Sequence, residues 1–371
     1  MKTNITYIIS NINKSLAFEW ISTHLSKERY NLNFILLNPG GSELEIFLKE
    51  NKIPFERIKY TGKREIIKAV VATYKSLKKY KTNIVHTHLF DANIIGLTAA
   101  WLARVPKRIH TRHHSNYHHT YHPNAVKYDK IVNFLSTDIV AISKIVSSVL
   151  TGKENVRSNK VHLIHHGFQL KEFNNIAESS VNRLRQKYNP INQRPVLGVI
   201  SRYLKLKGIQ FIIPAFEKLL TSHPNALLIL ANAHGPYKKQ VAELLERIPK
   251  RNYIEISFEA DIFSLYKIFD LFIHVPIDEA YEAFGQTYIE SLAAEVPSVF
   301  TLSGIAHEFI RDRSNALVVP YQNSDSIHKA LLELLANNTL CELLIQNGKK
   351  VIETKFELNK MILSLEKLYG R

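Results

Sequence analysis

Short apolar runs alternate with amphipathic stretches along the first half of the chain. The apolar runs predict strands at 5–9, 32–37, 55–59, 83–86, 107–111, 138–142 and 160–164. Apolar residues at helical spacing predict helices between them, at 14–25, 42–50, 64–81, 92–104 and 125–135. Strands that are apolar along their whole length are typical of a sheet covered on both faces. The pattern therefore predicts an α/β fold built on a doubly wound parallel sheet.

A polar passage at 169–193 interrupts this alternation, and a second set of elements follows it. Strands are predicted at 195–200, 226–230, 253–256, 271–274 and 298–301, with helices at 208–220, 237–247, 262–268, 285–295, 324–335 and 339–347. A chain of 371 residues is too long for one typical core. We therefore expect two domains, 1–168 and 169–354, with a last helix at about 355–371 that packs back on the first. Two such domains joined by a hinge imply a ligand cleft between the carboxyl ends of their strands.

Positive charge is concentrated in the first half of the chain. Residues 1–170 hold 25 Lys and Arg against 11 Asp and Glu, whereas the remaining 201 residues hold 24 against 22. The first part thus carries +14 of the formal net charge of +16. The helix at 64–81, with Lys107, Arg108 and Arg112, supplies much of this charge. We expect this half to dock on an anionic membrane surface, with a solvated helix face as the alternative.

The cysteine count and the N-terminal segment indicate the cellular compartment in which we expect the protein. Cys341 is the only cysteine, so no internal disulfide can form, which fits a reducing compartment. The N-terminal segment reads as a strand rather than a signal peptide, and no run of about 18 uncharged apolar residues exists to span a bilayer. We expect a cytoplasmic protein, peripheral on the inner membrane face where it meets lipid.

Two charged pairs stand at strand-to-helix turns in the second half. Arg202 follows the strand at 195–200, and Lys207 precedes Gly208 at the start of the next helix. A guanidinium and an ammonium in such a place can neutralise a diphosphate. Further on, Glu282 and Glu290 lie on either side of a glycine turn, where a helix begins with unpaired amides. Solvated surface cations and an acidic loop ahead of an ordinary helix are the alternatives.

These motifs, in this order, resemble the signature of the retaining glycosyltransferases of family four. The matching pieces are Arg202-x4-Lys207-Gly208, Glu282-x7-Glu290, His86-Thr87-His88, Thr111-Arg112-His113, the strand 138–142 leading to Ser143, and 164–168. The resemblance covers most of the chain. It implies the GT-B fold, with two Rossmann-like doubly wound domains that face a central cleft. It also implies a hexosyltransferase that moves a sugar, with retention, from a UDP- or GDP-sugar to a glycan or lipid-linked acceptor in cell-surface polysaccharide biosynthesis.

The resemblance further implies a role for each matched residue in binding the donor. Arg202 and Lys207 should bind the diphosphate, and Glu290 should hold the nucleotide ribose through its hydroxyls. Such an enzyme stabilises the departing diphosphate by charge and needs no covalent nucleophile. Because cations and helix amides neutralise the leaving group, we expect neither a metal nor a cofactor besides the nucleotide sugar.

The remaining implied contacts concern the sugar and the base. Glu282, with the backbone amides of Phe284-Gly285-Gln286, should hold the transferred sugar and the nearer phosphate. His113, from the first domain, should contact the sugar near the reacting carbon. The base is expected to stack near Phe258.

Other interpretations remain open. The histidine-rich loop 113–122 suggests a metal site, but a metal needs ligands that converge on one point, and we favour the alternative that these side chains line an acceptor site. A nucleotide-sugar epimerase of related fold would use the same donor site, but its extra acid and base carboxylates cannot be placed here. A nucleic-acid-binding protein would explain the charge; yet aromatics are not interleaved with it, no binding module is visible, and the glutamate stretch would have no role. We therefore expect no nucleic-acid partner.

Overall fold

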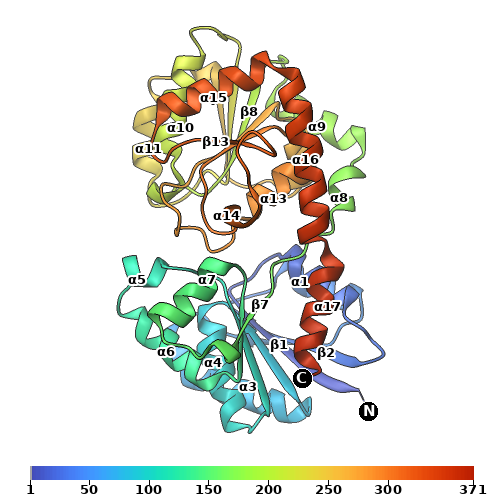
Figure 1. Cartoon of the computed structure of the whole chain (residues 1–371). Coiled ribbons are helices and arrows are strands. Elements are labelled where there is room, and N and C mark those ends of the chain that lie inside the picture. The colour runs from blue at the N-terminus through green and yellow to red at the C-terminus, as the bar shows by residue number, and fades with distance from the viewer. Residues whose placement is uncertain (1) are drawn as a thin grey trace. The chain divides into compact units, whose positions relative to one another are not determined.

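The structure is a computed structural model that describes residues 2–371, and the chain divides into two compact units (Figure 1). The first unit contains the residues up to Phe168 together with Leu358–Arg371. The second unit is Gln169–Glu357. Each unit has its own parallel sheet and its own core, so each is described by itself.

The first unit is built on a seven-stranded parallel sheet. Its strands are β1 (Thr3–Ser10), β2 (Tyr30–Asn38), β3 (Phe55–Lys59), β4 (Ile84–His88), β5 (Lys107–Arg112), β6 (Asp138–Ala141) and β7 (Val161–Leu163), in the order β3-β2-β1-β4-β5-β6-β7. Its helices are α1 (Leu16–His24), α2 (Glu43–Glu50), α3 (Ile66–Lys79), α4 (Phe90–Leu102), α5 (Tyr117–Tyr121), α6 (Ala125–Leu135), α7 (Lys144–Ser148) and α17 (Leu358–Tyr369). The strand order reverses between β1 and β4, which is where ligands bind in open α/β sheets.

The second unit has a six-stranded parallel sheet. Its strands are β8 (Val196–Ile200), β9 (Leu227–Ala231), β10 (Tyr253–Ile256), β11 (Leu271–His274), β12 (Ser298–Phe300) and β13 (Leu317–Val318), in the order β10-β9-β8-β11-β12-β13. Its helices are α8 (Lys171–Asn174), α9 (Glu178–Tyr188), α10 (Ile209–Leu219), α11 (Lys238–Leu245), α12 (Ile262–Tyr266), α13 (Gln286–Ala293), α14 (Ala306–Phe309), α15 (Ser324–Ala336) and α16 (Asn338–Phe356). Here the order reverses between β8 and β11. Two doubly wound parallel sheets confirm the predicted fold class.

Side-chain hydrogen bonds cap the first turn of three helices. Ser42, Ser143 and Asn323 each accept a hydrogen bond from a backbone amide in the first turn of α2, α7 and α15. Such caps satisfy amides that the helix itself leaves unpaired.

The structure differs from the sequence prediction in several elements. One helix expected at 355–371 is the end of α16 followed by α17, with an extended residue, Glu357, between them. The short helices α5, α8 and α14 and the two-residue strand β13 were not predicted, because segments this short carry too little hydrophobic periodicity. Ile67 and Val71 belong to the apolar spacing that predicts the helix at 64–81, but both side chains are exposed.

The C-terminal helix α17 completes the core of the first unit. Its buried side chains are Leu358, Met361, Ile362, Leu365, Leu368 and Tyr369, at helical spacing. Gly167 permits the close approach, since a Cβ there would lie 2.8 Å from the Cα of Leu358. At the far end of α17, the Tyr369 hydroxyl hydrogen-bonds the Tyr7 hydroxyl and lies 2.8 Å from Nδ1 of the buried His86. The last residues are therefore tied to the two central strands.

We expect Tyr369→Phe to destabilise the first unit by about 1–3 kcal/mol, because it removes a partner from two buried polar groups. Urea unfolding, followed with a probe in the first unit, measures the change. Leu363→Ala is the matched control, since Leu363 lies on the same helix but is 65% exposed. Equal shifts for both variants would contradict the role given to the hydroxyl.

Candidate functional site

A tight backbone contact shapes the carboxyl edge of the second unit's sheet. After β8 the chain makes a 3-10 turn at Lys205–Lys207 and enters α10 through Gly208, whose φ is 76°. A Cβ on Gly208 would lie only 1.9 Å from the carbonyl oxygen of Val275, just after β11. The amide of Ile277 also donates to the carbonyl of Leu206 at 3.1 Å. Only glycine fits, and the contact places Lys207 beside the loop that follows β11.

Lys207 forms an ion pair with Glu282 at this edge. The Lys207 Nζ contacts Glu282 Oε1, and His274 Nε2 lies 3.2 Å from the same oxygen. Glu282 is buried, which by itself raises the pKa of its carboxyl group. The Lys207 ammonium and His274 outweigh that effect and lower the pKa of Glu282 to about 2. The carboxylate is therefore ionised at neutral pH, and it is held beside a cation.

The loop that carries Glu282 is anchored on both sides. The Glu282 amide donates to Ser303 Oγ at 3.0 Å, and the amide of Ile305 donates to the carbonyl of Phe284 at 3.1 Å. A Cβ on Gly304 would lie 2.7 Å from the Glu282 carbonyl oxygen. Next, Gly285, with φ 88°, turns the chain into α13. The segment 278–285 is thus fixed before the helix begins, and the first amides of α13 lie beside Phe284-Gly285-Gln286.

Glu290 lies inside α13 and has different neighbours. The Tyr266 hydroxyl donates to Glu290 Oε2 at 2.9 Å. Burial raises the pKa of Glu290 to about 7, and the hydrogen bond from Tyr266 only partly opposes this. The two glutamates therefore have opposite electrostatic environments, because one has a cation beside it and the other a phenol.

Two further predicted residues lie at the same carboxyl edge. Arg202 lies two residues after the end of β8; its side chain is exposed, and within residues 2–371 it makes no side-chain hydrogen bond or ion pair. Phe258 follows β10 and is 63% exposed. The predicted diphosphate-, base- and sugar-binding residues thus lie on loops that follow β8, β10 and β11 of one parallel sheet.

His113 belongs to the first unit and lies at the end of β5. Its Nε2 is 3.1 Å from His88 Nδ1, and its ring stacks on His166 with centroids 5.6 Å apart. Burial, followed by the neighbouring imidazoles of His166 and His114, lowers the pKa of His113 well below its ordinary value. The ring is neutral at physiological pH. Its contact with a donor sugar stays a prediction.

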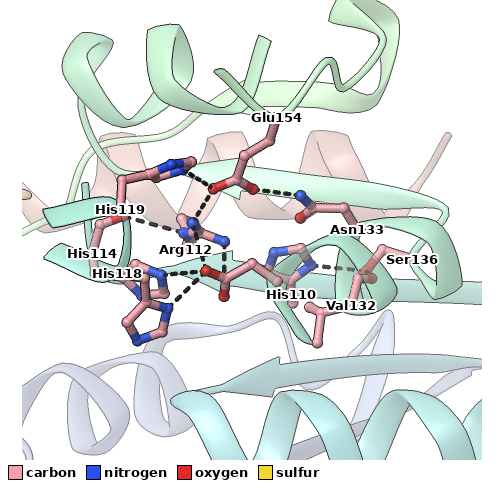
Figure 2. A network of polar contacts seen from close by, with 10 residues as sticks. His110, Arg112, His114, His118, His119, Val132, Asn133, Ser136 and Glu154 are labelled. Atoms are coloured by element: carbon pink, nitrogen blue, oxygen red, sulfur yellow. Dashed lines mark hydrogen bonds and ion pairs between the residues drawn. The ribbon is translucent and has the colours of Figure 1, made fainter. Parts of the chain in front are cut away.

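A buried polar network surrounds Arg112, next to His113 (Figure 2). Arg112 pairs with Asp129 at 3.2 Å and with Glu154, and all three side chains are almost fully buried. Arg112 is therefore not one of the cations of a membrane surface, and the prediction made from the charge distribution was wrong for this residue. Lys107 and Arg108 likewise donate to backbone carbonyls of their own unit, to Leu368 and to Leu135 and Val105.

Sequence reasoning missed several residues of these sites. His274, Ser303 and Tyr266 hold the two glutamates in the second unit. His274 is the last residue of a predicted strand, a position that commonly faces a ligand, so the sequence held a usable signal for it. Ser303 and Tyr266 had no motif around them. No helix within residues 2–371 combines the length and the apolar character that crossing a bilayer requires.

Two family models of glycosyltransferases match this chain, one in each unit, and named relatives align with most of it. A family model described as glycosyl transferases group 1 matches residues 180–351, and a model described as glycosyltransferase family 4 matches residues 21–172. The capsular polysaccharide biosynthesis glycosyltransferase CapM of Staphylococcus aureus is 24% identical over 100% of this chain and 98% of its own length. The alpha-monoglucosyldiacylglycerol synthase of Acholeplasma laidlawii is 26% identical over 76% of this chain and 73% of its own length.

Solved structures share the fold over the whole chain. A glycosyltransferase from Rickettsia africae superposes with a TM-score of 0.82 at 20% identity, over 99% of this chain and 98% of that one. Anabaena HepE, solved with UDP and glucose, gives a TM-score of 0.84 at 16% identity, over 99% of both chains. These likenesses confirm the two-domain GT-B arrangement expected from the sequence.

The raised pKa of Glu290 predicts how stability depends on pH. The folded chain favours the protonated carboxyl, so this contribution to stability is complete below about pH 4.5 and is lost as the pH rises through about 7. Relative to wild type, Glu290→Gln should therefore gain stability between pH 4.5 and 8, by up to about 3 kcal/mol. Urea unfolding at both pH values measures this. Glu353→Gln, at an exposed position, should show no such trend; parallel curves for Glu290→Gln and wild type would refute the assignment.

Proposed function

The chain belongs to the glycosyltransferases of group 1 and family 4, and from that premise we propose that it is a retaining enzyme that uses a nucleotide diphosphate sugar. One observation carries the proposal. The ion pair of Lys207 with the buried Glu282 lies at the carboxyl edge of the second sheet, in the unit where Arg202 follows β8 with its guanidinium exposed. An ammonium, a guanidinium and an ionised carboxylate suit a ligand that has both a diphosphate and sugar hydroxyls.

Lys207 and Arg202 would bind the diphosphate and stabilise its charge as it leaves. Lys207 is already oriented by Glu282, so its ammonium loses little freedom when the donor binds. The unpaired amides at the start of α13 add a positive dipole end. With these groups present, the diphosphate needs no metal ion, and we propose none at this site.

The other donor contacts follow from the same edge. Glu282 would accept hydrogen bonds from the transferred sugar, with the Phe284-Gly285-Gln286 amides on the nearer phosphate. Glu290 would hold the ribose hydroxyls, and Phe258, whose ring is exposed, would stack on the base. HepE, which shares the fold, was solved with UDP and with UDP-glucose. That supports a nucleotide-sugar donor and leaves UDP and GDP both open.

The proposed reaction passes through an oxocarbenium-like state. The anomeric carbon–oxygen bond to the diphosphate breaks, and the acceptor hydroxyl forms the new bond on the same face. The leaving phosphate takes the proton of that hydroxyl. His113, neutral because of its burial, would contact the sugar near the reacting carbon as a hydrogen-bonding group. The protein contributes mainly electrostatic stabilisation of the departing diphosphate.

The acceptor is proposed to be a glycan or a lipid-linked glycan of a cell-surface polysaccharide. CapM is named for capsular polysaccharide biosynthesis, and the Acholeplasma relative is named as a glucolipid synthase. Neither the family models nor these relatives support the epimerase alternative, and nothing favours a nucleic-acid partner. The polysaccharide assignment for this chain rests on that similarity.

Lys207→Ala and Glu282→Ala should each lower turnover by at least about tenfold, the scale of losing one transition-state contact. Transfer or hydrolysis of labelled UDP- and GDP-sugars measures the rate. Lys205→Ala is the matched control, because Lys205 is an exposed lysine of the same turn and should leave turnover unchanged. Wild-type rates in both test variants, with melting temperatures also unchanged, would show that the donor site lies elsewhere.

We also propose that the first unit docks on an anionic membrane surface from the cytoplasmic side. Without Lys107, Arg108 and the buried Arg112, residues 61–135 hold 10 Lys and Arg against 3 Asp and Glu. On α3 the lysines at 68, 75, 78 and 79 are exposed beside Ile67, which is 79% exposed. On α6, Lys127 and Lys130 are exposed beside Phe134, which is 80% exposed. Exposed apolar side chains among lysines are what an interfacial helix presents to anionic lipid.

Replacing Lys68 and Lys75 together by Glu should weaken binding to anionic vesicles by at least about tenfold, since each lysine near such a surface contributes about 1 kcal/mol. Co-sedimentation with phosphatidylglycerol vesicles measures the partitioning. Lys238→Glu with Lys239→Glu, on α11 of the second unit, is the control with the same change in net charge. Binding that ignores anionic lipid, or falls equally in both double variants, contradicts the docking surface.

A further inference from the structure

Three potential metal ligands converge in the first unit, outside the donor site (Figure 2). His114 follows β5, His118 lies on α5, and Asp129 lies on α6. Asp129 Oδ2 is 2.7 Å from His118 Nδ1 and 3.3 Å from His114 Nε2. The three donor atoms all lie within 4.8 Å of one another. The two histidines belong to the loop 113–122 that suggested a metal site from the sequence. Asp129 could not be included in that prediction, because it lies on the next helix.

We propose that His114, His118 and Asp129 form a binding site for a divalent transition-metal ion, with Zn²⁺ the best match. Two imidazole nitrogens and one carboxylate oxygen are among the ligands that Zn²⁺ takes, with a fourth position left for water. Mg²⁺ and Ca²⁺ favour sites made of oxygen ligands and fit this donor set poorly. This site is independent of the proposed transferase reaction.

The groups around the three ligands support a metal site. Arg112 NH1 lies 3.2 Å from Asp129 Oδ1, and Arg112 NH2 lies 3.2 Å from Oδ2. Arg112 itself is held by Glu154. A ligating carboxylate is commonly oriented by such hydrogen bonds from a neighbouring side chain. The orientation of Asp129 is therefore set whether or not an ion is bound.

The charge of the cluster also favours a cation. Asp129 and Glu154 are both buried carboxylates, and Arg112 is the one permanently charged cation that pairs with them within residues 2–371. With neutral imidazoles, which metal binding requires, the cluster carries one net negative charge. The second carboxylate offsets the repulsion between Arg112 and a dication. Unpaired buried charge is costly, so a bound cation removes a penalty.

Metal binding here needs only a change of tautomer. Without an ion, the two imidazole N–H groups donate to Asp129 Oδ2. With an ion, those nitrogens offer lone pairs, and each proton moves to the other nitrogen of its own ring. No proton is lost from the imidazoles, and the carboxylate stays ionised. The ion would thus tie the segment 114–118 to α6, immediately after His113.

A pocket adjoins one of the three ligands. A cavity of about 490 Å³ opens between α3, α4, α5 and α6, and His118 is part of its wall. The wall also contains Asp91, His122 and Tyr128, so it is polar enough to hold water next to His118.

The test is metal binding by the full-length protein after removal of bound metal with a chelator. We expect about one equivalent of Zn²⁺ or Co²⁺ per chain, with the visible absorption bands of four-coordinate Co²⁺. His118→Ala and His114→Ala should each abolish tight binding and the bands. His119→Ala is the matched control, because His119 contacts Glu154 rather than Asp129 and should leave both unchanged.

Thermal unfolding gives a second readout that separates ligation from folding. Zn²⁺ should raise the melting temperature of wild type and of His119→Ala but not of His118→Ala, whose fold is checked by circular dichroism. No stoichiometric binding by wild type, or equal binding by His118→Ala, would overturn the site and leave a hydrogen-bonded network only. The affinity for nucleotide sugars, measured separately, reports on the donor site. We expect it to be the same in His114→Ala, His118→Ala and His119→Ala as in wild type.

Discussion

The ion pair between Lys207 and Glu282 is the interaction on which the donor end of this molecule depends. It joins residues 75 positions apart in the chain, and it exists because Gly208 lets the β8–α10 turn touch the backbone after β11. A buried carboxylate without a cation would take up a proton, and a proton on Glu282 would remove its acceptor role. The contact at Gly208 therefore sets the charge of the site as well as its shape.

The same pair explains how two glutamates on one turn and helix have different chemistry. The pKa of Glu282, which lies next to Lys207 and His274, is about 2, so its carboxyl group is ionised at neutral pH. The pKa of Glu290, which lies next to Tyr266, is about 7. Glu282 is therefore a hydrogen-bond acceptor at neutral pH, which suits the hydroxyl-binding role expected of it from the sequence.

Much of this could be predicted from the sequence, and the failures share one physical cause. Apolar runs and helical spacing predicted the two parallel sheets, because burial on both faces dictates that pattern. The burial of Arg112 could not be predicted, since its partners Asp129 and Glu154 lie 17 and 42 residues further along. Nothing local distinguishes a guanidinium that will be buried from one that will be solvated. Ser303 and Tyr266 were missed for the same reason, because tertiary contacts define their roles.

The charged side chains of the two units differ in how completely they are paired within their own unit. Around Arg112 two buried carboxylates of the same unit, Asp129 and Glu154, share one guanidinium, and this network lies in the chain next to His113. In the second unit Lys207 is paired, but Arg202 extends into solvent with its donors unused among residues 2–371. A guanidinium at the end of a central strand costs little when solvated and gains most from an anion. The exposed guanidinium of Arg202 therefore marks the second unit as the one that awaits an anionic ligand.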